Sequence, residues 1–401
     1  MHYDQTILKK LVPSGAIFFM KKIYYSGLNF ESDWLGLRSF TLSELLMFFA
    51  IVWVALLIVS LGLWSFQKAG LLDRPGPDII PKRNPVPTAQ GIFLTGGFFL
   101  TIALFFPDYF FDQHFLWFVL GGVIILAISL LDTFFSVNAK IRLWVQILVS
   151  LIVIVAWNIW LPEIELWSMV IKIPYLISLI FSVLWFVAFI NAVNWFDGIN
   201  GLASWVSSVG FLTIPLLIQF VVFVHYPEIE AQNYQFLSMI SDLSLVLFIF
   251  SFLYTIVEFK PRGVLRDVGT MFYGLALAYL SLVWGAKIGT ILVALSLVIF
   301  DAVWVFINRI FVMKKNPLKG DYTHLHYRLL ALGWTRSEVR FFVWIYSFVM
   351  MVLMLLQWDN RPWKIIILLM SFLIFFWVNI YLFWIKKLPY EYLKKNNSKE
   401  K

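Results

Sequence analysis

Five short segments of this chain carry side chains that could act on a phosphate group. They combine acids with amides, imidazoles and cations. Carboxylates can hold a divalent metal ion, and basic side chains can hold phosphate oxygens. Phosphoryl transfer depends mostly on positioning and on neutralising charge. The candidate residues are Asp73, Lys82, Asp132, Lys140, Asn191, Asn194, Asp197, Asn200, Arg266, Asp267, His324, His326 and Arg328.

The third segment, residues 191–201, has the most regular spacing. Polar side chains recur at every third position from Asn191 to Asn200, so a continuous helix would show them on one face. Gly198 and Gly201 predict that the helix opens into a tight turn near the end of this series. An ordinary helix cap would also use Asn or Asp, but four such residues in register exceed what a cap needs.

Two aspartates, Asp132 and Asp267, each adjoin an apolar helix on the same side of the expected membrane. They could share one Mg²⁺ ion, with water and substrate phosphates completing its ligands and Mn²⁺ as the alternative metal. Asp301 lies within an apolar segment, where it could either face the protein interior or pair with Arg309. The sequence leaves these two alternatives open.

The fifth segment contains two histidines, His324 and His326. Their spacing of two residues does not suit the helical zinc pair, and the chain has no cysteine. With Arg328 nearby they favour an anion-binding loop, the alternative being loop histidines without a role.

The elements that must position these segments are membrane helices. Hydrophobic residues make up 61% of the chain and charged residues 13%, whereas soluble domains have roughly 45–50% and about 25%. The composition predicts an all-α, polytopic integral membrane protein with about 10–11 transmembrane helices. The expected spans are Leu45–Trp64, Gly91–Phe106, Phe115–Leu131, Leu143–Trp160, Ile173–Ile190, Ala203–Phe223, Phe236–Val257, Val268–Trp284, Ile288–Phe311, Phe341–Leu356 and Trp363–Trp384.

Basic residues are concentrated in every second connection between these spans, beginning with the first. The positive-inside rule therefore predicts a cytoplasmic (inner) membrane protein whose five polar segments all face the cytoplasm. Three regions are expected: an interfacial amino-terminal extension at 1–41, one transmembrane domain at 42–386, and a basic tail at 387–401. No nucleic-acid-binding motif accompanies the net charge of +8.

The order of the motifs resembles that of the polyprenyl-phosphate N-acetylhexosamine-1-phosphate transferases (the WecA and MraY superfamily, glycosyltransferase family 4). The resemblance extends from about residue 45 to 340 and is nearer the N-acetylglucosamine-phosphate branch. It is carried by Asp73-Arg74-Pro75 with Pro85-Val86-Pro87, Asp132-Thr133, Asn191 to Gly201, Arg266 to Thr270, and His324 to Leu330.

The resemblance implies a reaction and a set of roles. A UDP-sugar would transfer its sugar-1-phosphate, expected to be N-acetylhexosamine-1-phosphate, to undecaprenyl or another polyprenyl phosphate. The products would be UMP and a lipid-diphosphate-sugar, the first intermediate of a cell-envelope glycan. Asp267 would ligate Mg²⁺, and Asp132 would activate or position the lipid phosphate. The nucleotide sugar would contact Asn194, Asp197 and Lys140, the two histidines would contact phosphates, and a homodimer is the expected assembly.

Several motif positions depart from the family pattern. Two carboxylates are missing and two cations are gained, which would weaken metal binding unless Arg266 binds the diphosphate directly. The alternative function is therefore a catalytically silent homologue that binds lipid-linked sugar or scaffolds a glycan-assembly complex. The departures are Thr133 and Asn200 for Asp, Arg266 for Gly, Val264 for an aromatic residue, Tyr327 for His and Lys82 for His.

Overall fold

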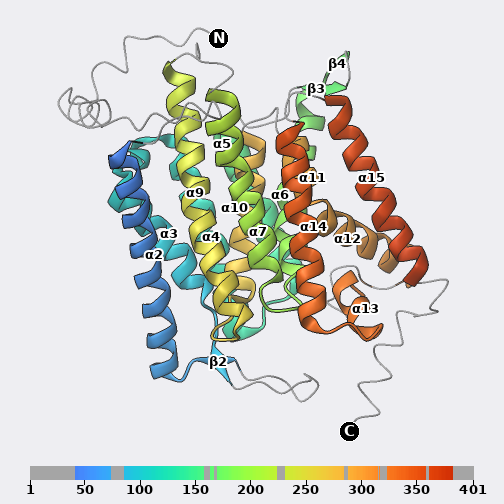
Figure 1. The fold of residues 1–401 in the computed structure, drawn as a ribbon, viewed down its shortest axis with the longest axis horizontal. Coiled ribbons are helices and arrows are strands. Elements are labelled where there is room, and N and C mark those ends of the chain that lie inside the picture. Colours follow the sequence, from blue (N-terminus) through green and yellow to red (C-terminus); the bar gives the residue numbers. More distant parts are fainter. Residues whose placement is uncertain are drawn as a thin grey trace.

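A computed structural model describes residues 41–73, 85–157, 163–166, 169–223, 231–283, 288–314, 316, 323–357 and 361–382. The described part is almost entirely helical, as the composition predicted (Figure 1). Its elements are α2 (Leu42–Ala69), β1 (Leu72–Asp73), β2 (Val86–Pro87), α3 (Gly91–Phe105), η2 (Pro107–Phe111), α4 (Gln113–Phe135), α5 (Ala139–Trp157), β3 (Glu163–Leu166), β4 (Met169–Lys172), α6 (Tyr175–Trp195), α7 (Leu202–Leu217), η3 (Ile218–Val222), α9 (Ala231–Phe259), α10 (Arg266–Val283), α11 (Ile288–Ala294), α12 (Ser296–Ile307), η4 (Asn308–Val312), α13 (Leu325–Ala331), α14 (Arg336–Leu356) and α15 (Arg361–Ile380).

The helices are those of a multi-pass membrane protein. Within the described residues, eight helices are long and apolar enough to cross a bilayer, counting α7 together with η3. The helix α3 is apolar but has only 15 residues. Every expected span coincides with a helix or a helix pair, so the predicted fold class is confirmed.

One expected span, Ile288–Phe311, is not a single helix. It is divided at Leu295 into α11 and α12, and it ends in the π-helical turn η4. The hydroxyls of Ser296, Tyr346 and Ser371 lie together at the break, with Ser371 donating to Ser296 at 2.8 Å. These hydroxyls satisfy one another inside the bundle, where an unpaired polar group would be costly.

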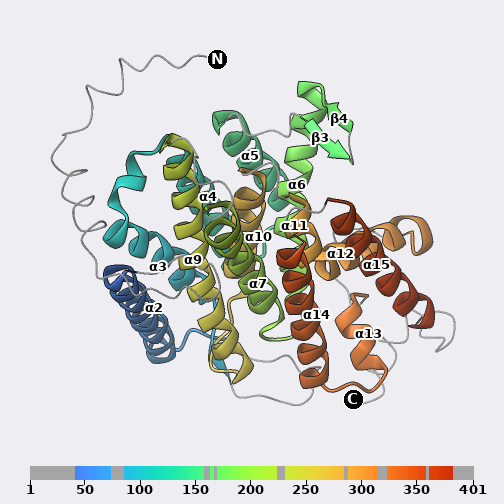
Figure 2. The ribbon, with the colours of Figure 1, turned by 45° about the horizontal axis from the view of Figure 1, so that its top comes forward.

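The helix α10 lies at the centre of the bundle and carries Asp267 at its amino-terminal end (Figure 2). It packs against α3, α4, α6 and α7. Gly274 permits a close contact with α6, because a Cβ there would lie 2.4 Å from the Cα of Ile190. The site residues on α6 and α10 are therefore held by two helices in near-backbone contact.

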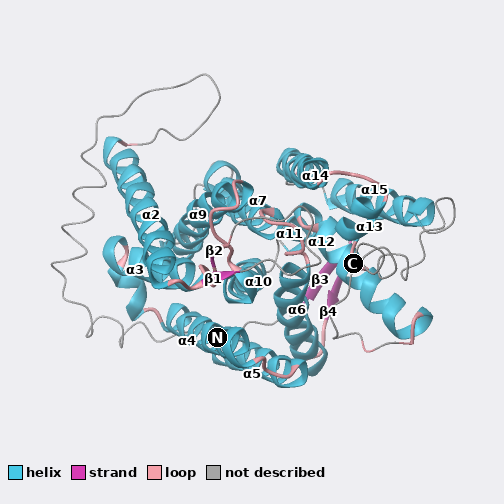
Figure 3. Ribbon diagram, turned by 90° about the horizontal axis from the view of Figure 1, so that it is seen from below, coloured by secondary structure: helices cyan, strands magenta, loops and turns pink. Residues whose placement is uncertain are grey.

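The described polar segments gather at one end of the bundle. The β1–β2 pair and α13 lie at the lower end in Figure 1, and the β3–β4 hairpin lies at the upper end. Seen from below, β1 and β2 lie beside the end of α10, and α13 lies farther away, beyond α11 and α12 (Figure 3). The two expected terminal regions fall largely outside the described residues, although Thr41 caps α2 by accepting a hydrogen bond from the Glu44 amide at 3.2 Å.

Candidate functional site

The two aspartates that the sequence singled out lie close together. Asp132 belongs to the last turn of α4, and Asp267 is the second residue of α10. One nitrogen, Nη1 of Arg142, donates hydrogen bonds to both carboxylates and lies 2.7 Å from Oδ2 of Asp267. Because both carboxylates contact the same nitrogen of Arg142, they lie close enough together to bind a single cation.

Arg142 is a candidate site residue that the sequence analysis did not single out, whereas it named Lys140 from the same turn. Both belong to the first turn of α5, but the Lys140 side chain is exposed whereas the Arg142 side chain is partly buried between the two carboxylates. The available signal was helical phase: Arg142 precedes the buried Gln146 by four residues, so the two share a helix face. Lys140, two residues before Arg142, does not lie on that face of the helix.

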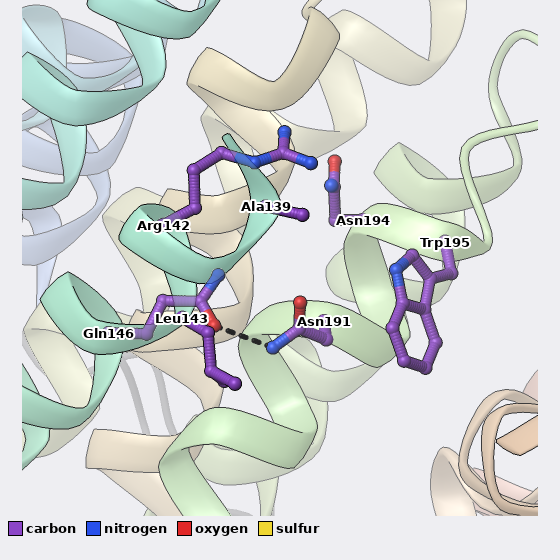
Figure 4. Close-up of a pocket in the computed structure, with 7 residues that line it drawn as sticks. All are labelled: Ala139, Arg142, Leu143, Gln146, Asn191, Asn194 and Trp195. Carbon is purple, nitrogen blue, oxygen red and sulfur yellow. Dashed lines mark hydrogen bonds between the residues drawn. The ribbon is translucent and has the colours of Figure 1, made fainter. Parts of the chain in front are cut away.

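A small pocket with a volume of about 20 Å³ opens beside these groups (Figure 4). Asn191 on α6 donates to Oε1 of Gln146 at 2.6 Å, which closes one side of the pocket. Asn194, one turn later, accepts a hydrogen bond from the Thr270 hydroxyl at 2.6 Å. The pocket is lined by Ala139, Arg142, Leu143, Gln146, Asn191, Asn194 and Trp195.

The 191–201 segment changes from helix to turn close to Gly198 and Gly201, as these glycines predicted. The helix α6 ends at Trp195, and Asp197 and Asn200 lie in the turn before α7. Gly201, the residue just before α7, has φ of 85°, a left-handed conformation that favours glycine. Burial raises the pKa of Asp197 well above its ordinary value, and the charges of Glu258 and Asp267 raise it further.

Arg266 links the first and fourth segments. Its Nη2 forms an ion pair with Oδ1 of Asp73 on β1, a carboxylate that is only 8% exposed. The Arg266 backbone has φ of 60°, which is strained for a residue with a side chain and would suit glycine. Lys82, from the same first segment as Asp73, lies outside the described residues.

The fifth segment packs into a buried polar cluster. Asp301 accepts hydrogen bonds from Nδ1 of His324 and from the Leu325 amide, both at 2.8 Å, and lies 3.7 Å from Nη2 of Arg328. Asp301 is fully buried, so its carboxylate faces the protein interior. Nη2 of Arg309 lies 3.5 Å from Nε2 of His324 in the same cluster. This cluster fixes the start of α13, which carries the second histidine.

His326 lies directly against the turn that contains Asp197. A Cβ at Gly198 would be 1.9 Å from Nε2 of His326, and the His326 ring meets Phe196 edge to face. The imidazole is 1% exposed, and neither ring nitrogen has a hydrogen-bond partner among the described residues. Burial lowers the pKa of His326 to about 3, with a further contribution from His324, so the ring is neutral at pH 7.

The contact at Gly198 gives a first prediction. Gly198→Ala should destabilise the protein by about 1–3 kcal/mol, because the methyl group must displace the buried imidazole. Thermal unfolding in detergent would show this as a lower melting temperature. Gly96→Ala is the matched control, because a Cβ there meets nothing within 4 Å, and it should leave the protein unchanged or stabilise it. Equal melting temperatures for the two variants would contradict the packing described.

The donors present fit a divalent cation only in part. No group of three acidic, histidine or cysteine side chains that could hold a metal is found among the described residues. Two carboxylates do meet at one position, and two protein carboxylates with water and substrate phosphates are an ordinary set of ligands for Mg²⁺. A metal bound there would share or take the position that Nη1 of Arg142 holds.

Comparisons with known proteins agree with the motif order. Residues 115–285 match the family model described as glycosyl transferase family 4. That range contains Asp132, Arg142, the 191–201 segment and Asp267, but not Asp73 or the histidines. The chain is also 25% identical, over 145 residues, to a probable undecaprenyl-phosphate N-acetylglucosaminyl 1-phosphate transferase of Bacillus subtilis (strain 168). The match covers 34% of this chain and 40% of that relative's length.

Proposed function

Because the chain resembles glycosyl transferase family 4 across residues 115–285, as its motifs predicted, we propose that it transfers a sugar-1-phosphate from a UDP-sugar to a polyprenyl phosphate. The observation that carries the proposal is the meeting of Asp132, Asp267 and Arg142 beside a pocket lined with amides. The similar protein from Bacillus subtilis bears a name of this class, with undecaprenyl phosphate and N-acetylglucosamine as the groups named.

In the proposed reaction an oxygen of the lipid phosphate attacks the sugar-bearing phosphorus of the UDP-sugar. The anhydride bond to UMP breaks as the new anhydride bond forms, so UMP leaves and the product is a lipid-diphosphate-sugar. No other co-reactant is required. The membrane helices place the site at one end of the bundle, where a lipid phosphate head group and a soluble nucleotide can meet.

The chain's own side chains supply charge and orientation. Arg142 and Arg266 carry permanent positive charge beside the reacting acids, and guanidinium groups bind phosphate oxygens through paired hydrogen bonds. Asn191 and Asn194 offer amides at the pocket for the sugar or the nucleotide. Asp132 would activate or position the attacking lipid phosphate.

Mg²⁺ is part of the proposal. Asp267 and Asp132 would ligate the ion, which when bound would neutralise charge on the donor diphosphate. Arg142 would then turn from the carboxylates toward the phosphates. The positive-inside pattern supports a site that faces the cytoplasm.

One observation favours a second function, that of a silent homologue that binds lipid-linked sugar. Arg142 pairs with both carboxylates, and Thr133 and Asn200 stand where the family pattern has further acids. A site closed in this way could bind a phosphate without transferring it.

Release of UMP by the purified protein in detergent tests the proposal. The assay contains Mg²⁺, undecaprenyl phosphate and UDP-N-acetylglucosamine, followed by a panel of other UDP-sugars. UMP release that requires the lipid phosphate is the expected result. No release with any donor, from protein that unfolds cooperatively, would overturn the transferase and favour the silent homologue.

A further inference from the structure

A buried acid outside the five segments lies between two of them. Glu258 is in the last turn of α9 and is only 1% exposed. It belongs to none of the motifs discussed above, and the proposed chemistry gives it no task. A buried carboxylate is costly unless its oxygens accept hydrogen bonds, so its partners indicate what it does.

The carboxylate accepts hydrogen bonds from both of its neighbouring segments. Oε1 accepts from the Leu265 amide at 3.1 Å, and Oε2 accepts from the Ser204 hydroxyl. The Gly201 amide faces the same carboxylate.

The segments that contact Glu258 are adjacent in sequence to two candidate site residues, Asp197 and Asp267. Gly201 closes the turn that holds Asp197, four residues earlier, and Leu265 precedes Asp267 by two residues. Thus one carboxylate ties the turn before α7 to the start of α10, although the two segments are 64 residues apart in sequence (201 to 265). The Glu258 charge is also near enough to raise the pKa of Asp197.

The same end of α9 also holds the first segment. Tyr254, one turn before Glu258, donates its hydroxyl to the Gln90 carbonyl at 3.1 Å. The backbone N–H of Gln90 donates to the Val264 carbonyl at 3.1 Å, and the backbone N–H of Val264 donates to the Pro87 carbonyl at 3.0 Å. Three of the polar segments are therefore joined to the last two turns of one helix.

We propose that Glu258 is a positioning residue that sets the separation of Asp197 and Asp267. Its role in catalysis rests on the proposed transferase function, whereas its structural link does not. A side chain that ends in two polar atoms, one of them an acceptor for the Leu265 amide, can bind both segments at once, whereas alanine can bind neither. Without it, buried amides would lose their acceptor and the two segments could move independently.

The experiment compares Glu258→Ala with Glu258→Gln and with Glu338→Gln as a control. Glu338 caps α14 at an exposed position and touches none of the five segments. In Glu258→Ala, kcat should fall about 100-fold with KM within about 3-fold, because the substrates still bind while the reacting groups are misplaced. Glu258→Gln keeps an acceptor for Leu265 and should recover most of kcat.

Amide hydrogen exchange measures the link without relying on activity. Glu258→Ala should speed exchange in residues 199–204 and 264–268 together, and Glu258→Gln should do so less. Exchange that changes in only one of these segments, or kcat unchanged in Glu258→Ala, would overturn the proposal. If the wild-type protein releases no UMP, the transferase fails while the exchange result still decides whether Glu258 joins the two segments.

Discussion

Replacing Asp267 by Asn should reduce lipid-dependent UMP release by at least about 1,000-fold. The change removes one negative charge and keeps the shape of the side chain. The amide oxygen of Asn can still accept the hydrogen bond from Arg142, so the fold should be preserved. The expected loss is one of kcat, measured as UMP released per enzyme at saturating donor and lipid phosphate.

Asp108→Asn is the matched control for this variant. Asp108 is exposed in η2, at the opposite end of α4 from Asp132. It carries the same chemical change on the other face of the bundle and should retain wild-type release. If Asp267→Asn and Asp108→Asn release UMP at similar rates, Asp267 has no part in the reaction and the assignment of the site is wrong.

Replacing Arg142 by Gln should lower UMP release by about 100-fold or more. The guanidinium lies between Asp132 and Asp267 and is the cation placed to meet phosphate oxygens at these acids. Arg142→Lys should lie between the wild type and Arg142→Gln, because the ammonium keeps the charge and loses the paired geometry. Lys140→Gln, two residues earlier on an exposed face, is the control and should stay within about 2-fold, as surface substitutions usually do.

The same variant separates two roles for Arg142. If Arg142→Gln binds Mg²⁺ more tightly than the wild type while keeping full UMP release, the guanidinium is only a counter-ion that the metal replaces. If release is lost and Mg²⁺ affinity rises little, Arg142 acts on the substrate. Isothermal titration with Mg²⁺ beside the UMP assay distinguishes the two.

The helices could be predicted well from the sequence because their main signal is local. A run of apolar residues as long as a bilayer is thick indicates a span without knowledge of its neighbours, as in α2 and α4. The break at Leu295 could not be predicted in this way, since Leu295 and Ser296 fit a continuous helix as well as a divided one. At that break Ser296 contacts the hydroxyls of Tyr346 and Ser371, which come from helices later in the chain.

The site could be predicted in part. Asp132 and Asp267 were found because acids at the ends of apolar helices are unusual, and the structure places them together. Arg142 was missed since it was one of several loop cations and only its orientation on α5 distinguishes it. Glu258 was missed because its importance lies in contacts with Gly201 and Leu265, which only the packing of α9 creates.

The central position of α10 bears on how the chain enters the membrane. Within the part of the chain that the structure describes, this helix has 18 residues and is not one of the eight that are long and apolar enough to cross a bilayer. It begins with Arg266 and Asp267, and most of its side chains are buried against other helices. Its four main neighbours, α3, α4, α6 and α7, all precede it in the chain. During synthesis these helices are made first, so α10 can leave the translocon into a protein-lined space and need not partition into lipid by itself.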